Sequence, residues 1–136
     1  MKTTGYSGTP LARKLGIKPG YALRLIDIPG HYFDLFDDFP EGTTRPETGP
    51  FDLIHFFADR MAALEATLPE LKASIRPNGI IWVSWPKKSS GVPSDMTENL
   101  IRDTALAMGL VDVKVCAVDD VWSGLKLVIP VSQRPV

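Results

Sequence analysis

The run Lys87–Gly91, with the sequence KKSSG, combines the groups that proteins use to bind an anion. It follows the apolar run Ile80–Trp85, which predicts a buried strand, and it precedes a predicted helix start at Ser94–Asp95. Ammonium groups, hydroxyls and backbone N–H groups are the usual partners of a phosphate. The G-x-x-x-x-G-K-[ST] pattern of a P-loop is absent from the sequence. We expect a phosphate-bearing ligand at Lys87, Lys88, Ser89 and Ser90, with a solvated surface loop as the alternative.

Three further polar residues are expected near this run, because ligands of open α/β sheets bind beyond the carboxyl ends of the strands. Asp27 and His31 lie at the end of the predicted strand Tyr21–Ile28 and just after it. Asp59 follows the predicted strand Phe51–Ala58. We therefore add Asp27, His31 and Asp59 to the ligand-binding residues, although capping of the next helix would also explain Asp59.

The remaining chemistry-bearing residues favour structural roles. His55 lies inside an apolar run and is expected to be a core histidine with a hydrogen bond. Asp119 and Asp120 are expected to be turn residues, and the single cysteine, Cys116, a small buried hydrophobe. Two distant histidines without clustered carboxylates do not have the spacing of a metal site, so no metal is expected.

Strand and helix patterns alternate along the chain, which indicates a three-layer, Rossmann-like α/β fold with a mostly parallel sheet. Two closing strands, Val111–Val118 and Leu125–Val131, are joined by too short a connection for a parallel crossover, so they are expected to form an antiparallel pair. Four helices are predicted. The first two are Leu11–Leu15, which ends at Gly16, and His31–Phe39. The third begins at Asp59, has a core stripe at Leu64, Leu68, Leu71 and Ile75, and is interrupted at Pro69; the fourth covers about Met96–Met108 and is opened by a capping box of Asp95 and Glu98.

Composition sets bounds on the class of protein. A chain of 136 residues with 44% hydrophobic residues suits one globular domain, 1–136. A formal net charge of -1 gives no general attraction for nucleic acid or for anionic membranes. The N-terminal segment MKTTGYSGTP does not have the apolar core of a secretion signal, so we expect a cytoplasmic protein.

Two segments resemble class I S-adenosylmethionine-dependent methyltransferases. Phe51–Ile54 is similar to the fourth strand of that fold, and Leu71–Ser84, with the sequence LKASIRPNGIIWVS, is similar to its next helix, turn and fifth strand. The resemblance implies a shortened methyltransferase fold. The run Pro29–Tyr32, however, stands where that family has a glycine-rich loop, and only 22 residues separate Ile28 from Phe51. The family places two strands and two helices in this interval, and these elements build its adenosine pocket. Because the interval is too short for them, we expect no cofactor.

A second resemblance spans nearly the whole chain and is to a family of short bacterial proteins of unknown function. It is carried by the blocks YSGTPLA (Tyr6–Ala12), KLGI, WVSWPKK, VKVCA and WSGLK (Trp122–Lys126). It implies a small stand-alone domain and no particular activity.

These observations favour a non-catalytic module that binds a small anion or a protein partner. A divergent methyltransferase-like enzyme is the first alternative, and a subunit that forms a homo-oligomer through an edge strand is the second.

Overall fold

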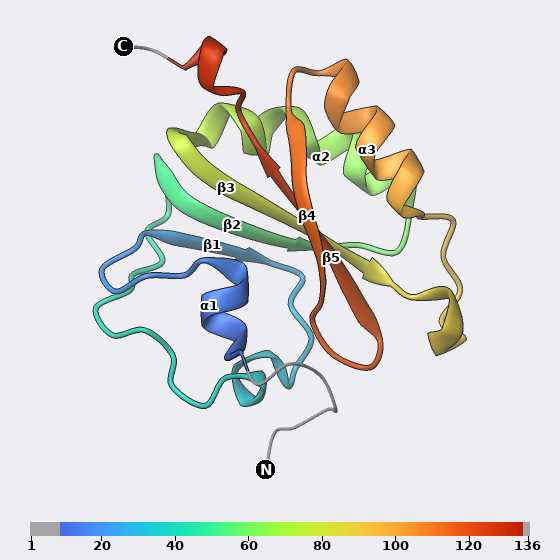
Figure 1. Ribbon diagram of the computed structural model, residues 1–136, viewed down its shortest axis with the longest axis horizontal. Coiled ribbons are helices and arrows are strands. Elements are labelled where there is room, and N and C mark those ends of the chain that lie inside the picture. The colour runs from blue at the N-terminus through green and yellow to red at the C-terminus, as the bar shows by residue number, and fades with distance from the viewer. Residues whose placement is uncertain (1–8, 135–136) are drawn as a thin grey trace.

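Five strands form one sheet in the order β1-β2-β3-β5-β4 (Figure 1). The computed structural model describes residues 9–134, so the start of the block Tyr6–Ala12 lies outside the described residues. The strands are β1 (Leu23–Ile26), β2 (Phe51–Phe57), β3 (Ile75–Pro86), β4 (Val111–Ala117) and β5 (Trp122–Val128). β1, β2 and β3 are parallel, whereas β5 is antiparallel to both β3 and β4. The predicted sheet, with its closing antiparallel pair, is confirmed.

The central strands are those with the most continuous apolar sequence. In β2 every residue except Asp52 is buried, and in β3 the whole run Ile81–Pro86 is buried. Such runs suit strands that are covered on both faces. β1 is short and lies at one edge of the sheet, where Thr44 forms an isolated bridge with Ala22 and its carbonyl accepts from the N–H of Leu23 at 2.8 Å.

One face of the sheet is covered by α2 (Met61–Ser74) and α3 (Glu98–Ala107), which share one core cluster with β2, β3 and β5. Leu64, Leu68 and Leu71 are fully buried, as the predicted stripe requires. The predicted interruption at Pro69 is wrong, because α2 continues through it to Ser74. Pro69 itself is exposed, on the side of the helix away from the core.

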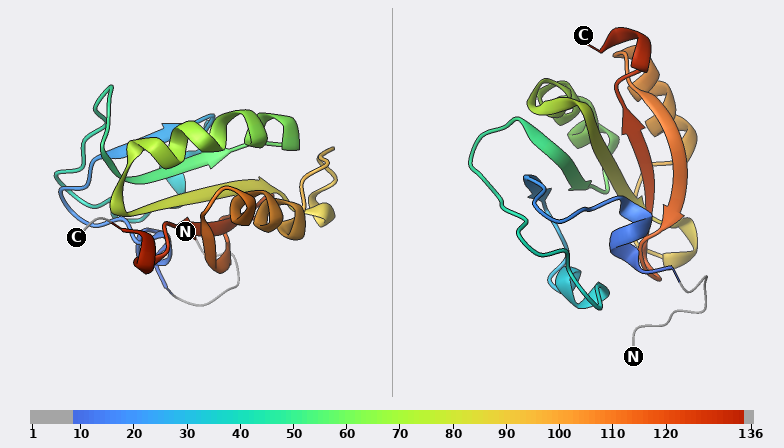
Figure 2. Two further views of the ribbon diagram at one scale, coloured as in Figure 1. Left: turned by 90° about the horizontal axis from the view of Figure 1, so that it is seen from above. Right: turned by 60° about the vertical axis from the view of Figure 1, so that its left-hand side comes forward.

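The opposite face carries a thinner layer made of α1 (Leu11–Leu15) and the 3-10 turn η1 (Tyr32–Leu35). In the right-hand view of Figure 2 these two elements lie at the lower end of the molecule, and α2 and α3 at the upper end. The indole Nε1 of Trp82 donates a 2.7 Å hydrogen bond to the carbonyl of Leu15, which fixes α1 on the sheet. Gly16 ends the helix with a φ of 83°, in the left-handed region that favours glycine.

The helix expected over His31–Phe39 is wrong, since only the turn η1 forms. Phe36 is already extended, with a φ of -109° and a ψ of 131°. Pro40 and the pair Asp37-Asp38, which favour turns, leave little room for a longer helix. Two remaining 3-10 turns, η2 (Lys88–Ser90) and η3 (Val131–Gln133), follow β3 and β5.

Candidate functional site

The candidate site lies where β1, β2 and β3 end. The antiparallel pairing of Pro86 with Trp122 brings the turn between β4 and β5 to the same edge. The backbone N–H of Lys87 donates to the carbonyl of Val121 at 2.7 Å, which joins the lysine run to that turn. Loops far apart in the sequence therefore meet at one edge, as expected for this class of sheet.

His31 and Asp119 form the most developed polar contact at this edge. The Nε2 of His31 lies 2.8 Å from the Oδ2 of Asp119, and because a carboxylate can only accept, Nε2 carries the hydrogen. The other oxygen of Asp119 accepts from the backbone N–H groups of Val121 and Trp122, at 2.8 and 2.7 Å. The carboxylate is nearly buried, while the histidine side chain is 51% exposed. This arrangement leaves the half-exposed imidazole without a second hydrogen-bond partner, at Nδ1, within residues 9–134.

Beneath this pair runs a fully buried polar chain. The hydroxyl of Tyr32 lies 3.0 Å from Nδ1 of His55, and Nε2 of His55 lies 2.8 Å from Oγ of Ser84. Burial lowers the pKa of His55 to about 3 and raises the pKa of Tyr32, so both side chains are neutral at physiological pH. The prediction that His55 is a hydrogen-bonded core residue is confirmed. The chain has the polar groups of a proton relay, but all three side chains are inaccessible to a ligand.

The lysine run is a loop whose hydroxyls are partly used within the loop itself. Ser90 donates to the carbonyl of Lys87 at 2.6 Å and accepts from the N–H of Val92 at 3.2 Å. Lys88 and Ser89 are exposed, and Lys87 is half-buried. Neither lysine makes an ion pair with any carboxylate in residues 9–134.

The predicted helix start beside this loop is wrong. α3 begins at Glu98, and its cap is Thr97, whose hydroxyl accepts from the N–H of Leu100 at 3.2 Å. Ser94 accepts instead from Met96. The start of α3 is therefore further along the chain than predicted, and it does not adjoin the lysine run in sequence.

The expected caps of the two long helices are also wrong. Asp95 does not form a box with Glu98, since its Oδ1 accepts from the N–H of Met61, at the start of α2, at 2.8 Å. Asp59 is exposed and caps nothing, because Arg60 occupies the cap position of α2 without a side-chain bond. Asp27 is exposed as well, with a φ of 55°, at the end of β1. Within the described residues neither Asp27 nor Asp59 makes an ion pair with His31 or the lysines.

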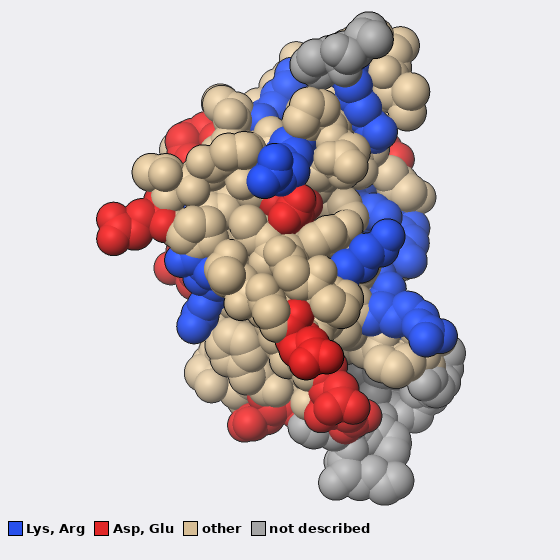
Figure 3. Space-filling view, turned by 90° about the vertical axis from the view of Figure 1, so that its left-hand side faces the viewer, with Lys and Arg blue, Asp and Glu red and all other residues tan. Residues whose placement is uncertain are grey.

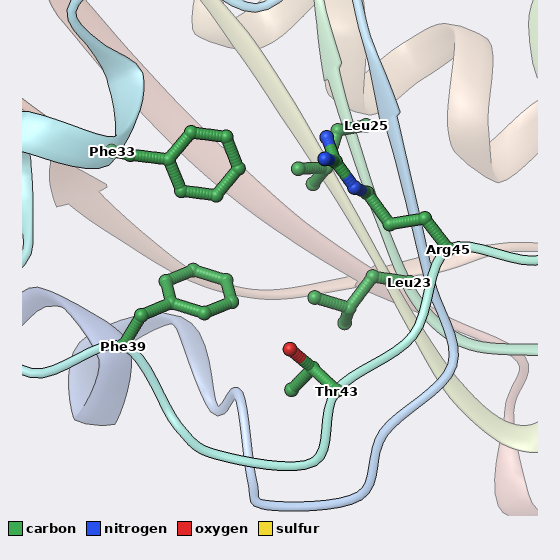
Figure 4. Close-up of a pocket in the computed structure, with 6 residues that line it drawn as sticks. All are labelled: Leu23, Leu25, Phe33, Phe39, Thr43 and Arg45. Atoms are coloured by element: carbon green, nitrogen blue, oxygen red, sulfur yellow. The ribbon is translucent and has the colours of Figure 1, made fainter.

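A pocket of about 190 Å³ opens beside β1, away from the lysine run (Figure 4). It is lined by Leu23, Leu25, Phe33, Phe39, Thr43 and Arg45. The sequence pattern does not reveal this pocket, because it puts Phe33 and Phe39 on the buried face of a helix that does not form. The available signal is the density of aromatic residues in the segment that follows Gly30.

Residues 9–134 contain neither a metal-binding cluster nor a membrane-spanning helix. No group of three histidine, cysteine or acidic side chains there is placed to hold a metal ion. No helix in this part of the chain has the length and apolar character needed to cross a membrane.

Comparison with known proteins identifies the fold. No family model and no curated protein matches the sequence. Among solved structures, a ribosomal protein L11 methylase from Lactobacillus delbrueckii subsp. bulgaricus is 12% identical with a TM-score of 0.52, over 86% of this chain and 73% of that one. A putative methyltransferase from Thermoplasma acidophilum is 8% identical with a TM-score of 0.55, over 95% of this chain and 77% of that one.

A variant of LepI, solved in complex with SAH and a substrate analogue, is 14% identical with a TM-score of 0.54. The match covers 88% of this chain but only 39% of LepI. Likeness at such identities shows the fold alone. The chain thus has a Rossmann-like α/β fold that resembles class I S-adenosylmethionine-dependent methyltransferases.

Proposed function

We propose that this chain is a non-catalytic binding domain that uses a methyltransferase-like sheet to hold a small phosphate-bearing anion at its carboxyl edge. The observation that carries the non-catalytic part is the packing beyond β1. Tyr32 is fully buried there against Phe36 and Phe57, with ring centroids 5.2 and 5.7 Å apart. Aromatic side chains thus fill the place where the backbone of a glycine-rich loop would have to approach a nucleotide.

The position of β1 supports the same conclusion. It is an edge strand, and in residues 9–134 the sheet continues beyond it by an isolated bridge between Ala22 and Thr44. The strands that build an adenosine pocket in complete methyltransferases would lie on that side. The blocks that resemble short bacterial proteins of unknown function are part of this proposal, because the resemblance would imply a small domain of this reduced kind.

We place the anion at the carboxyl edge of the sheet because of the cationic side chains there. Lys87 and Lys88 have no carboxylate partner among the described residues. An anion that contacts lysine ammonium groups gains charge-assisted hydrogen bonds, which are about twice as strong as neutral ones. The exposed hydroxyl of Ser89 is a further donor in the same loop.

A thermal-shift series tests this proposal. Sodium phosphate is compared with sodium chloride at equal ionic strength, and phosphate is expected to raise the Tm more. The double variant Lys87→Ala/Lys88→Ala is expected to lose that difference. The matched control is Arg13→Ala/Lys18→Ala, which removes two exposed cations that precede β1. Equal shifts by the two salts, or loss of the phosphate effect in the control variant alone, would contradict the proposal.

A second candidate function is S-adenosylmethionine-dependent catalysis, which is favoured by the likeness to methyltransferase structures and by the His31–Asp119 pair. A histidine held by a carboxylate, with its other nitrogen exposed, is suited to general-base chemistry. Isothermal calorimetry with S-adenosylmethionine and S-adenosylhomocysteine separates the two candidates. Saturable binding in the micromolar range would favour the enzyme, and no heat of binding would favour the non-catalytic domain.

A further inference from the structure

The pocket beside β1 has two apolar walls that face each other. Phe33 and Phe39 form one wall, with ring centroids 5.3 Å apart and planes at 70°, and the side chains of Leu23 and Leu25 form the other (Figure 4). Phe36 supports the aromatic wall from the core, with its ring 4.9 Å from that of Phe39. The walls are therefore packed against the folded core before any ligand arrives.

The size of the pocket suits a single aromatic ring. Its volume is about 190 Å³. An apolar cavity of about 150 Å³ accepts benzene, so this pocket has room for one ring and a small substituent. Phe33 is 44% exposed, so part of the aromatic wall is open to a ligand.

Two polar groups stand at the pocket, and both can donate hydrogen bonds. In Figure 4 the hydroxyl of Thr43 and the guanidinium of Arg45 point toward the space between the rings and the leucines. The Arg45 guanidinium lies 5.3 Å from the centre of the Phe33 ring. It makes no ion pair with a carboxylate in residues 9–134. A guanidinium presents five N–H donors in a fork that matches a carboxylate, and stacking on a ring leaves its edges open.

We propose that this pocket binds a small aromatic carboxylate. The ring of the ligand lies between the phenylalanines and the leucines, and its carboxylate pairs with Arg45 at the mouth. Thr43 donates to an oxygen of the same ligand. This site is separate from the anion site proposed at the carboxyl edge, because it shares no residue with the lysine run or with the His31–Asp119 pair.

The chemistry of the lining favours a carboxylate over the alternatives. An uncharged ring would bury apolar surface but leave Arg45 unused. A free phosphate would pair with Arg45 but would gain nothing from the four apolar side chains. Only a ligand with both parts uses the whole lining, and the ring also extends the stack that Phe33 and Arg45 already form.

An NMR titration of the ¹⁵N-labelled chain with sodium benzoate tests the site, and benzamide serves as the neutral probe of equal size. Benzoate is expected to give saturable shifts at the pocket residues, with a dissociation constant of about 1 mM or tighter. Benzamide is expected to bind about tenfold more weakly, because it cannot form the charge-assisted pair. Sodium acetate at the same concentration, which lacks the ring, is expected to cause no saturable shift.

Two variants assign the contacts. Arg45→Gln is expected to weaken benzoate binding about tenfold and to leave benzamide unchanged. The matched control, Arg60→Gln, removes an exposed arginine that does not line the pocket and is expected to bind benzoate as the wild type does. Phe33→Leu keeps an apolar side chain and is expected to weaken both probes. The proposal is overturned if benzoate does not saturate, if benzamide binds as tightly, or if the two arginine variants behave alike. Phosphate is not expected to displace benzoate. A failure of the pocket proposal can therefore be distinguished from a failure of the anion site proposed at the carboxyl edge.

Discussion

The imidazole of His31 and the carboxylate of Asp119 are joined by a 2.8 Å hydrogen bond, although 88 residues separate them in the sequence. The bond ties the loop after β1 to the turn between β4 and β5. Because Asp119 also accepts from the backbone of that turn, one carboxylate orders both loops. The Asp119 side chain therefore links the loop after β1 to a turn that also has backbone bonds of its own.

Asp119→Ala is expected to destabilise the fold by about 2 kcal/mol, since it leaves two backbone N–H groups and the His31 N–H without their acceptor. His31→Ala should cost less than about 1 kcal/mol, because the imidazole is half exposed and the turn keeps its own bonds. Urea unfolding of the two single variants and the double variant measures this. A larger cost for His31→Ala than for Asp119→Ala would contradict the assigned roles.

His55 gives the fold a defined dependence on pH. Its pKa is lowered from 6.5 to about 3 by burial, so the unfolded chain binds a proton at His55 more readily than the folded protein does. The free energy of unfolding therefore rises with pH between about 3 and 6.5, and it falls as the pH drops below about 6.5. Between pH 7 and pH 5 the expected loss from this residue is about 2 kcal/mol.

The variant His55→Gln isolates this contribution, because glutamine keeps polar atoms but does not titrate. Urea unfolding at pH 7, 6 and 5 is expected to show a steeper loss of stability for the wild type than for the variant. Parallel pH curves for the two proteins would mean that His55 binds a proton as readily in the folded protein as in the unfolded chain, against its burial between Tyr32 and Ser84.

The arrangement of the sheet could be predicted because long apolar runs and a short final connection leave few alternatives. The location of His31 after β1 could be predicted for the same reason. Its partner could not, because Asp119 reaches it only through the position of β5 beside β3. Asp119 and His31 meet because of the order of the strands in the sheet, and local sequence patterns do not determine that order.

The helix caps and the pocket show a second limit of sequence patterns. Asp95 has the spacing of a local cap but serves α2, 34 residues earlier in the chain. The ring of Phe33 fits an amphipathic stripe but stands at the surface, because the chain leaves the helical conformation at Phe36. In both cases a tertiary contact or a backbone turn outweighs a local preference.

Lys114 and Lys126 face each other across β4 and β5, and like charges at directly opposite positions destabilise a sheet. Burial, together with the charges of Lys114 and Lys18, lowers the pKa of Lys126. In Figure 3 many lysine and arginine side chains lie along the right-hand side of the view, with others near its centre and left. Lys114→Glu is therefore expected to raise the free energy of unfolding by about 0.5 kcal/mol, by replacing a repulsive pair with an attractive one.

The control for this prediction is Lys88→Glu, a charge reversal at an exposed position of η2 with no lysine opposite it on a strand. The gain of Lys114→Glu is expected to shrink in 1 M NaCl, where the Debye length is about 3 Å. A gain of the same size in both variants would assign the effect to net charge and not to the cross-strand pair.

Gly124 of β5, which pairs with Ser84 of β3, lies close against the side chain of Trp82. A Cβ at this position would lie 3.0 Å from a ring carbon of Trp82 and 3.3 Å from the hydroxyl of Ser84. Trp82 is fully buried and fixed by its bond to Leu15, so it cannot move aside without loosening α1.

Gly124→Ala is expected to cost about 1–3 kcal/mol as an overpacked core position. Gly30→Ala is the matched control, because a Cβ there meets no atom within 4 Å, and it should leave stability within about 0.5 kcal/mol. Thermal unfolding of both variants, with near-ultraviolet circular dichroism to follow the tryptophans, compares them. Equal stability of the two variants would mean that the indole has a second position in the core.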